Sequence, residues 1–261
     1  MKTIFRLLTE LSSRKTISKI TGQFAKSKMS KQLIPRFAKT YGINIKEAEK
    51  QLDEYVSLND FFTRRLKKGA RKIHQDENMV ISPVDGKITG IGTIENGQIV
   101  NVKGQDYTIE DLLNQSPRTV TYKHGFYMVL YLSPSDYHRI HAPISGKVVE
   151  TELIPGKVYP VNDFGLTHMP KVLSRNERLI SYIRHENTEV ALVKVGAMNV
   201  SSIRLVDPSA DEIHAGAEMA YFEFGSTVVL LFEKDSFQYN ERKFIGEKVK
   251  MGEALGQILT K

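Results

Sequence analysis

Cysteine is absent from this chain of 261 residues. Its absence excludes a disulfide framework, a thiolate zinc site and a cysteine nucleophile. Long apolar runs are absent too: the longest, such as residues 227–232, have strand length, whereas a membrane-spanning helix needs about 20 apolar residues. The first fifteen residues have no unbroken apolar core and no small-residue cleavage site, so they do not resemble a signal peptide.

Acidic residues are nearly missing from residues 1–40, where Glu10 stands against ten lysines and arginines. This segment carries a charge of +9, and because the whole chain carries +7, residues 41–261 sum to −2. A nucleic-acid-binding domain would be basic over its folded body, so we expect no nucleic-acid partner. The overall composition, 41% apolar and 26% charged, is that of an ordinary globular protein.

The basic end also shows helical periodicity, because Ile4, Leu7, Leu8 and Leu11 recur at helical spacing. A cationic helix with one apolar stripe suits the surface of an anionic membrane. We therefore predict that residues 1–72 form a helical, membrane-associating region. The alternative is a helix that packs on the protein's own body and leaves its basic face in water.

Two more helices are predicted in this region. Asn44, followed three residues later by Glu47, is a typical N-cap, and residues 48–56 place apolar side chains on one face. A further helix is expected to begin at Ser57 and to stop near Gly69.

Residues 73–261 have a different pattern, in which short β-rich runs are divided by Gly, Pro, Asn and Asp. These runs are 126–132, 179–183, 190–195, 220–224 and 227–232. They predict a mainly antiparallel catalytic β domain, and hence an α+β fold with amphipathic helices at its N-terminal end.

A weak internal repeat adds detail to this prediction. Residues 82–88 and 142–148 share the pattern Pro-x-x-Gly-Lys-(Ile/Val), which indicates two turns that lead into equivalent strands. Residues 246–256 have the glycine spacing of lipoyl- and biotinyl-carrier hairpins, so we expect a β-sandwich with hammerhead-like hairpins. The carrier function itself is not expected, because no Met-Lys-Met acceptor is present.

Three short segments combine reactive side chains with tight turns: Asp85 in 82–86, His138 and His141 in 137–143, and Ser226 in 224–227. Each also has a structural reading, as a turn aspartate, buried histidines and a strand bulge. The two histidines could share a metal, but no HExxH motif and no further ligand set is evident, so we expect no metal site.

Together these residues form a chemically sensible set. A serine hydroxyl becomes nucleophilic when a base takes its proton, and the base works best when a carboxylate fixes its tautomer. Asp85, His141 and Ser226 could fill these roles. Ser226, however, lacks a Gly-x-Ser-x-Gly elbow and lies inside a predicted strand pair, which is awkward for attack on an external ester.

The carbonyl of Gly225, directly before Ser226, is a different target. Attack by the Ser226 hydroxyl would convert the amide to an ester. Removal of the Ser226 α-proton would then eliminate the Gly225 carboxylate and leave dehydroalanine, and hydrolysis with loss of ammonia would give an N-terminal pyruvoyl group. Such a ketone can form a Schiff base with an amine substrate and act as an electron sink.

With these residues and the motifs around them, the chain resembles the phosphatidylserine decarboxylases of the bacterial proenzyme type. The motifs that carry the resemblance are Phe61-Phe-Thr-Arg64, Leu66-Lys-Lys-Gly-Ala-Arg71, Ser82-Pro-Val-Asp-Gly86, Asp136-Tyr-His-Arg-Ile-His-Ala-Pro143, Asn176-Glu-Arg178, Val195-Gly-Ala197 and Phe224-Gly-Ser-Thr227. Two positions depart from the family's pattern: Phe224 replaces a leucine and Ser201 replaces a glycine.

The resemblance implies self-cleavage between Gly225 and Ser226, which yields a β chain of residues 1–225 and an α chain of residues 226–261. It implies that Asp85, His141 and Ser226 act in cleavage, that Ser226 becomes a covalent pyruvoyl cofactor, and that His138 acts in decarboxylation.

The implied reaction turns phosphatidylserine into phosphatidylethanolamine and CO₂, a step of phospholipid biosynthesis at the cytoplasmic face of the cell membrane, where the protein would be peripheral. Arg139 and Lys147 are candidates to hold the phosphate, and a homodimer is left open. The rival readings are an uncleaved Ser-His-Asp hydrolase and a lipid-binding β-module without enzymatic activity.

Overall fold

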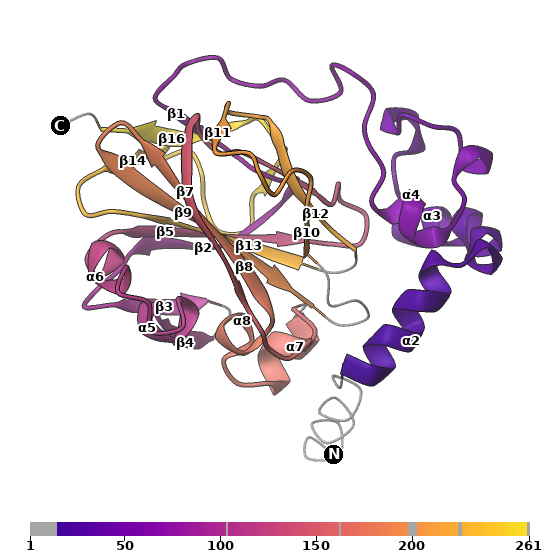
Figure 1. Ribbon diagram of the computed structural model, residues 1–261, viewed down its shortest axis with the longest axis horizontal. Helices are drawn as coiled ribbons and strands as arrows, with labels where there is room; N and C mark the ends of the chain where they lie inside the picture. The colour runs from indigo at the N-terminus through magenta and orange to yellow at the C-terminus, as the bar shows by residue number, and fades with distance from the viewer. Residues whose placement is uncertain (1–14, 103, 162, 198–202, 224–225, 260–261) are drawn as a thin grey trace.

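The computed structural model describes residues 15–102, 104–161, 163–197, 203–223 and 226–259. It is a mixed structure of few short helices and mostly antiparallel sheets, as the α+β prediction requires. The helices of residues 15–62 lie on one side of the β body, at the right of Figure 1, and the segment between the last of them and the first strand crosses over the top of this view. The finer prediction of a sandwich built from carrier-like hairpins stays a prediction.

The N-terminal helical part consists of short helices joined by tight turns. They are α2 (Lys15–Lys26), η1 (Lys28–Leu33), α3 (Ile34–Tyr41), η2 (Ile45–Glu47), η3 (Leu52–Glu54) and α4 (Leu58–Phe62). Ile34, Ala38, Tyr55, Leu58 and Phe61 pack into a small core of their own. The predicted stripe of residues 4–11 lies outside the described residues.

The helix predicted over residues 44–56 is wrong. Asn44 does cap a turn, since its side chain accepts from the Lys46 backbone N–H, but only the short turns η2 and η3 follow. The backbone of Glu49 donates to Arg65, and that of Lys67 donates to Glu47, so this stretch pairs with residues 65–67 instead of closing helical turns. For the same reason α4, which begins after the cap Ser57 as predicted, ends at Phe62 and does not reach Gly69.

The strands follow the predicted runs closely. Their bounds are β1 (Met79–Ile81), β2 (Gly86–Thr93), β3 (Gln98–Val102), β4 (Gln105–Thr108), β5 (Phe126–Leu132), β6 (Arg139–His141), β7 (Gly146–Ile154), β8 (Arg178–His185), β9 (Thr188–Gly196), β10 (Ile203–Leu205), β11 (Glu212–Ile213), β12 (Glu218–Phe222), β13 (Ser226–Phe232), β14 (Phe237–Tyr239), β15 (Lys248–Val249) and β16 (Ala254–Ile258). Short helices between them are α5 (Ile109–Leu112), α6 (Thr119–Tyr122), α7 (Asp163–His168) and α8 (Val172–Arg175).

The largest sheet has eight strands in the order β11-β7-β8-β9-β13-β5-β2-β15. Smaller sheets are β10-β12-β6, β1-β16-β14 and β3-β4, and every pair of adjacent strands in the described residues is antiparallel. Both faces of the large sheet are covered. Val228, Leu230 and Leu192 pack with Ile140 of β6 on one face, while Val229 and other alternate residues pack on the second face.

The predicted repeat is confirmed. Gly86 begins β2 and Gly146 begins β7, and each strand is second from an edge of the large sheet. Gly86 pairs with Val249 of one edge strand, and Gly146 pairs with Ile213 of the other. In each strand the register then shifts after the third residue, so the two turns lead into equivalent strands.

Close backbone packing at Gly146 gives a test of the fold. A Cβ added there would lie 2.3 Å from the Arg184 carbonyl oxygen, well inside contact distance. We expect Gly146→Ala to destabilise the protein by roughly 1–3 kcal/mol, because strand β7 must move away from β8. The change in apparent melting temperature, roughly 3–10 °C for a chain of this size, measures it.

Gly92→Ala is the matched control within the sheet, because a Cβ there would meet only the Tyr127 ring at 3.5 Å, an ordinary contact. Its melting temperature should lie within about 2 °C of the wild type. Equal losses in the two variants would contradict the argument from close approach.

Candidate functional site

Ser226 is the first residue of the central strand β13, where it pairs with Leu132 of β5 and with Gly196 of β9. Its side chain is fully buried, and among the residues that the structure describes its hydroxyl oxygen has no hydrogen-bond partner. Strand alternation puts the side chain on the same face as Val228 and Leu230, beneath the sheet that contains β6 and β12. Gly225 lies outside the described residues.

His138 follows β5 at the end of a tight loop, in which the Asp136 carboxylate accepts from the backbone and hydroxyl of Ser133 at 2.7 and 2.8 Å. The imidazole is fully buried and lies 4.0 Å from the Phe62 ring, centroid to centroid. Its Nδ1 donates to the Asp136 carbonyl at 2.9 Å, while Nε2 has no partner in the described part of the chain. Burial, aided by the charge of Arg64, lowers the pKa of His138 to about 3, so the ring is neutral at pH 7.

The structure brings Ser226 and His138 to one junction between two sheets. Ser226 pairs with Leu132, and the backbone N–H of Phe222 donates to the His138 carbonyl at 3.0 Å. Ser226 of one sheet therefore neighbours Leu132, and Phe222 of the other sheet neighbours His138, six residues further along the same segment.

His141 lies on β6 and is held by two hydrogen bonds. Its Nδ1 donates to the Gly216 carbonyl at 2.7 Å, so its Nε2 is free to accept from the Tyr137 hydroxyl at 3.0 Å. Burial lowers the pKa of His141, with a smaller effect of Arg139 in the same direction. The ring is thus a neutral imidazole with its basic nitrogen facing Tyr137.

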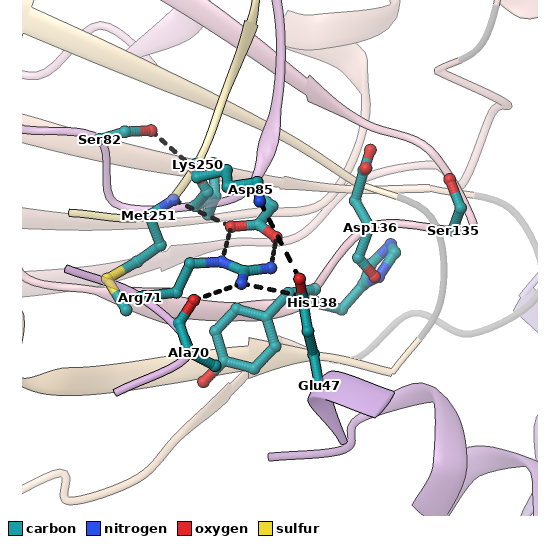
Figure 2. Close-up of polar contacts among 12 residues, drawn as sticks. Glu47, Ala70, Arg71, Ser82, Asp85, Ser135, Asp136, His138, Lys250 and Met251 are labelled. Atoms are coloured by element: carbon teal, nitrogen blue, oxygen red, sulfur yellow. Dashed lines mark hydrogen bonds and ion pairs between the residues drawn. The ribbon is translucent and has the colours of Figure 1, made fainter. Parts of the chain in front are cut away.

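Asp85 is buried in the turn before β2, and its carboxylate is fully engaged (Figure 2). Arg71 donates to both carboxylate oxygens, from Nε at 2.8 Å and from Nη2, and the backbone N–H of Met251 donates to Oδ1 at 2.9 Å. Glu47 contacts the far side of the same guanidinium at 2.8 Å. Asp85 is therefore not hydrogen-bonded to His141; the carbonyl of Gly216 orients that ring, and Asp85 favours its protonated form only through space.

Residues that the sequence analysis left out of the site complete it. Phe62 and Arg64, at the end of α4, contact His138 and its loop, and Arg71 holds Asp85. Arg139, which the sequence offered as a phosphate ligand, donates to the Thr63 carbonyl at 2.8 Å across the same junction. Phe62, Arg64 and Arg71 belong to the motifs 61–64 and 66–71, which were available as a signal, but the helical part was assigned to membrane association alone.

Within the described residues, no three or more His, Asp or Glu side chains are arranged to hold a metal ion. No helix in this part of the chain is long and apolar enough to cross a membrane.

Comparisons with known proteins point to one family. The phosphatidylserine decarboxylase family model matches residues 58–257. Proteins named phosphatidylserine decarboxylase proenzyme from Bacillus thuringiensis (strain Al Hakam) and Bacillus cereus (strain 03BB102) are 44% identical to this chain over 258 residues. These alignments cover 99% of this chain and 98% of each relative.

The buried His138 predicts a stability that depends on pH. Its pKa is about 3 when folded against an ordinary value of 6.5, so below pH 6.5 the unfolded chain takes up a proton that the folded chain does not. The contribution of the neutral His138 to the free energy of unfolding is complete above pH 6.5 and is lost as the pH falls toward 3. At pH 4.5 the loss should be roughly 2 to 3 kcal/mol.

Denaturant unfolding between pH 7.5 and 4.5 measures this loss. His138→Asn, whose amide nitrogen can replace Nδ1 as the donor to Asp136, should show a slope shallower by about one proton, or about 1.4 kcal/mol per pH unit. Parallel slopes for the two proteins would show that His138 titrates normally.

Proposed function

Because this chain belongs to the phosphatidylserine decarboxylase family, we propose that it removes the serine carboxyl group of phosphatidylserine after cutting itself between Gly225 and Ser226. The products are phosphatidylethanolamine and CO₂. The observation that carries the proposal is the Ser226 hydroxyl, which is fully buried, has no partner among the described residues and begins the central strand. A buried hydroxyl without a hydrogen bond is costly to keep, which is typical of a reacting group.

Cleavage uses groups of this chain alone. The Ser226 hydroxyl attacks the preceding carbonyl, the bond from that carbonyl carbon to the Ser226 nitrogen breaks, and an ester replaces the amide. His141 is the proposed base, because its ring is neutral and its unprotonated Nε2 can exchange the hydrogen bond from the Tyr137 hydroxyl for the serine proton. Asp85 stabilises the positive charge that His141 acquires, through space and not through a hydrogen bond.

The pyruvoyl group that Ser226 would become has a smaller volume than the serine residue with its preceding peptide group. It therefore needs no new cavity at the start of β13. When formed, it supplies a ketone that condenses with the substrate amine and accepts the electron pair released with CO₂. Phe62 and the apolar residues near His138 exclude water from the departing carboxylate. His138 is the proposed residue that returns a proton to the substrate carbon; because its ring is neutral in the resting site, its Nε2 must first take up that proton from water that enters with the substrate.

Processing is the first test. Ser226→Ala removes the nucleophile and should remain one chain of 261 residues, whereas the wild type should give fragments of 225 and 36 residues with the smaller one blocked at its N-terminus. The matched control is Thr227→Val, which keeps the side-chain volume and removes the adjacent buried hydroxyl, for which the described residues also provide no partner. Intact mass reports both the cleavage of the chain and the blocked N-terminus of the smaller fragment. A Ser226→Ala chain that is cut would refute the mechanism.

The two histidines should separate the two reactions. His141→Asn should slow chain cleavage by at least about 100-fold, because the nucleophile loses its base. His138→Asn should be cut normally but release CO₂ from phosphatidylserine at least about 100-fold more slowly. Cleavage is followed by gel and decarboxylation by labelled CO₂; a His138→Asn chain that stays whole would move this residue into the cleavage step.

These measurements also distinguish the rival readings. A Ser-His-Asp hydrolase would remain one chain and hydrolyse esters, and a lipid-binding module would bind vesicles without releasing CO₂.

We further propose that the protein works as a peripheral membrane protein and docks through its helical part. The exposed large apolar side chains of this part are Ile20, Phe24, Met29, Leu33, Tyr41, Ile45 and Val56. Exposed basic residues alternate with them along the chain, among them Lys28, Arg36 and Lys39, and a surface that is both apolar and basic suits an anionic bilayer.

Charge reversal tests this docking better than deletion of residues 1–40, which would remove Ile34 and Ala38 from the small helical core. The triple variant Lys28→Glu, Arg36→Glu, Lys39→Glu should bind anionic vesicles at least about 100-fold more weakly, since each basic residue adds about 1 kcal/mol. Vesicle flotation measures it, and processing should be unchanged.

The control carries the same change in charge on the β body: Lys123→Glu, Lys234→Glu, Arg242→Glu. All three side chains are exposed, far along the chain from the helical part. If both triple variants lose binding equally, docking depends on total charge and not on the helical surface.

A further inference from the structure

Arg64 is a buried arginine with unused donors. It directly follows Thr63, the C-cap of α4, and only 4% of it is exposed. Its Nη2 donates to the carbonyls of Ser135 and Asp136 at 3.0 and 3.1 Å, and its guanidinium carbon lies 5.4 Å from the Phe61 ring centre. Its Nε and Nη1 are closed to solvent and have no acceptor within the described ranges.

The charge of Arg64 is also not neutralised by contact. No carboxylate in the described part of the chain lies within ion-pair distance of it, and its nearest acids in electrostatic effect, Asp85 and Asp136, are already bound to other donors. Burial lowers the pKa of Arg64, which reflects the cost of holding this charge away from water. A buried cation that lacks a counter-ion is costly, so we expect an anion to complete the site.

The position of Arg64 identifies which reaction that anion takes part in. Arg64 donates to the loop that joins Leu132, the partner of Ser226, to His138. His138 has its own unpartnered Nε2 here, and the charge of Arg64 is one of the two causes that lower the pKa of this ring. An anion bound to Arg64 would offset that charge and ease protonation of His138.

We propose that Arg64 binds the phosphodiester of the substrate headgroup, an inference that rests on the proposed function. The headgroup offers two anions, the carboxylate and the phosphodiester. The carboxylate loses its charge as it leaves as CO₂, so an arginine bound to it would stabilise the substrate more than the transition state. The phosphodiester keeps its charge from substrate to product, and the guanidinium suits phosphate oxygens.

The two basic residues that the sequence offered for this role are less suitable. Arg139 is neutralised by Glu218, which also contacts Arg65. Lys147 is exposed on β7, where it pairs across the strand with Glu212 near an edge of the large sheet. Like Arg64, Arg139 donates to a backbone carbonyl across the junction, that of Thr63. Arg139 is therefore a matched control.

The test compares soluble headgroups as inhibitors of the cleaved enzyme acting on phosphatidylserine vesicles. Glycerophosphoethanolamine has the amine and the phosphodiester, ethanolamine has the amine alone, and serine has the amine and the carboxylate. In the wild type we expect glycerophosphoethanolamine to bind about 10- to 100-fold more tightly than ethanolamine. Arg64→Gln should lose that advantage, Arg139→Gln should keep it within about twofold, and Arg64→Lys, which keeps the charge, should retain part of it.

Each outcome has a distinct meaning. If Arg64→Gln keeps the advantage of the phosphodiester, Arg64 only ties α4 to the loop and the inference fails. If serine alone loses affinity, Arg64 holds the carboxylate, and the assignment is again overturned. Melting temperature shows that each variant is folded, and intact mass shows that it is cut. If Arg64→Gln does not fold or is not cut, Arg64→Lys takes its place in the comparison. A wild-type enzyme that is cut but releases no CO₂ would instead refute the proposed function.

The intact chain provides a last comparison. Since Nε and Nη1 of Arg64 are closed to solvent before cleavage, uncut Ser226→Ala protein should bind glycerophosphoethanolamine at least tenfold more weakly than the cleaved wild type. Equal binding, measured by calorimetry, would show that the headgroup occupies another surface and would overturn the inference.

Discussion

The pairing of β13 along its whole length is the constraint on which the rest of the structure depends. All seven of its residues pair with β5 on one side and with β9 on the other, and every one is buried. The strand can therefore hardly shift, and its first residue, Ser226, is held at one place. Beyond it, β15 pairs with β2 and β16 pairs with β1, so a chain cut before Ser226 remains joined across four strand pairs, two of them made by β13.

The helical part has two roles in this architecture. Several of its large apolar side chains are exposed, as are Lys28, Arg36 and Lys39, whereas its last residues contact the β body. Phe62 packs on His138, Arg64 donates to the loop before it, and Arg71 holds Asp85. The surface that we propose to bind the membrane and the segment that contributes to the candidate site are thus parts of one small unit.

The predictions of strands and helices were correct where the structure depends on residues that are close together in the sequence. The run 126–132 coincides with β5, and 227–232 lies within β13, because strands buried on both faces read as continuous apolar runs. The helix predicted over 44–56 failed because residues 47–49 pair with residues 65–67, an interaction that no local pattern reveals. Asn44 and Ser57, whose capping bonds are local, were identified correctly.

The proposed reacting groups could be named from the sequence alone, since Asp85, His138, His141 and Ser226 each stand in a short motif that a chain can display without folding. Their partners do not. The carboxylate expected to orient His141 is bound to Arg71, and the carbonyl that does orient the ring, at Gly216, is 75 residues away. Arg64 likewise has unused donors only because folding buries it beside a loop 71 residues distant that offers it two carbonyls, while the Asp136 carboxylate of this loop is bound to Ser133. Which groups are buried, and with which neighbours, depends on distant segments packing together, so only the tertiary structure decided it.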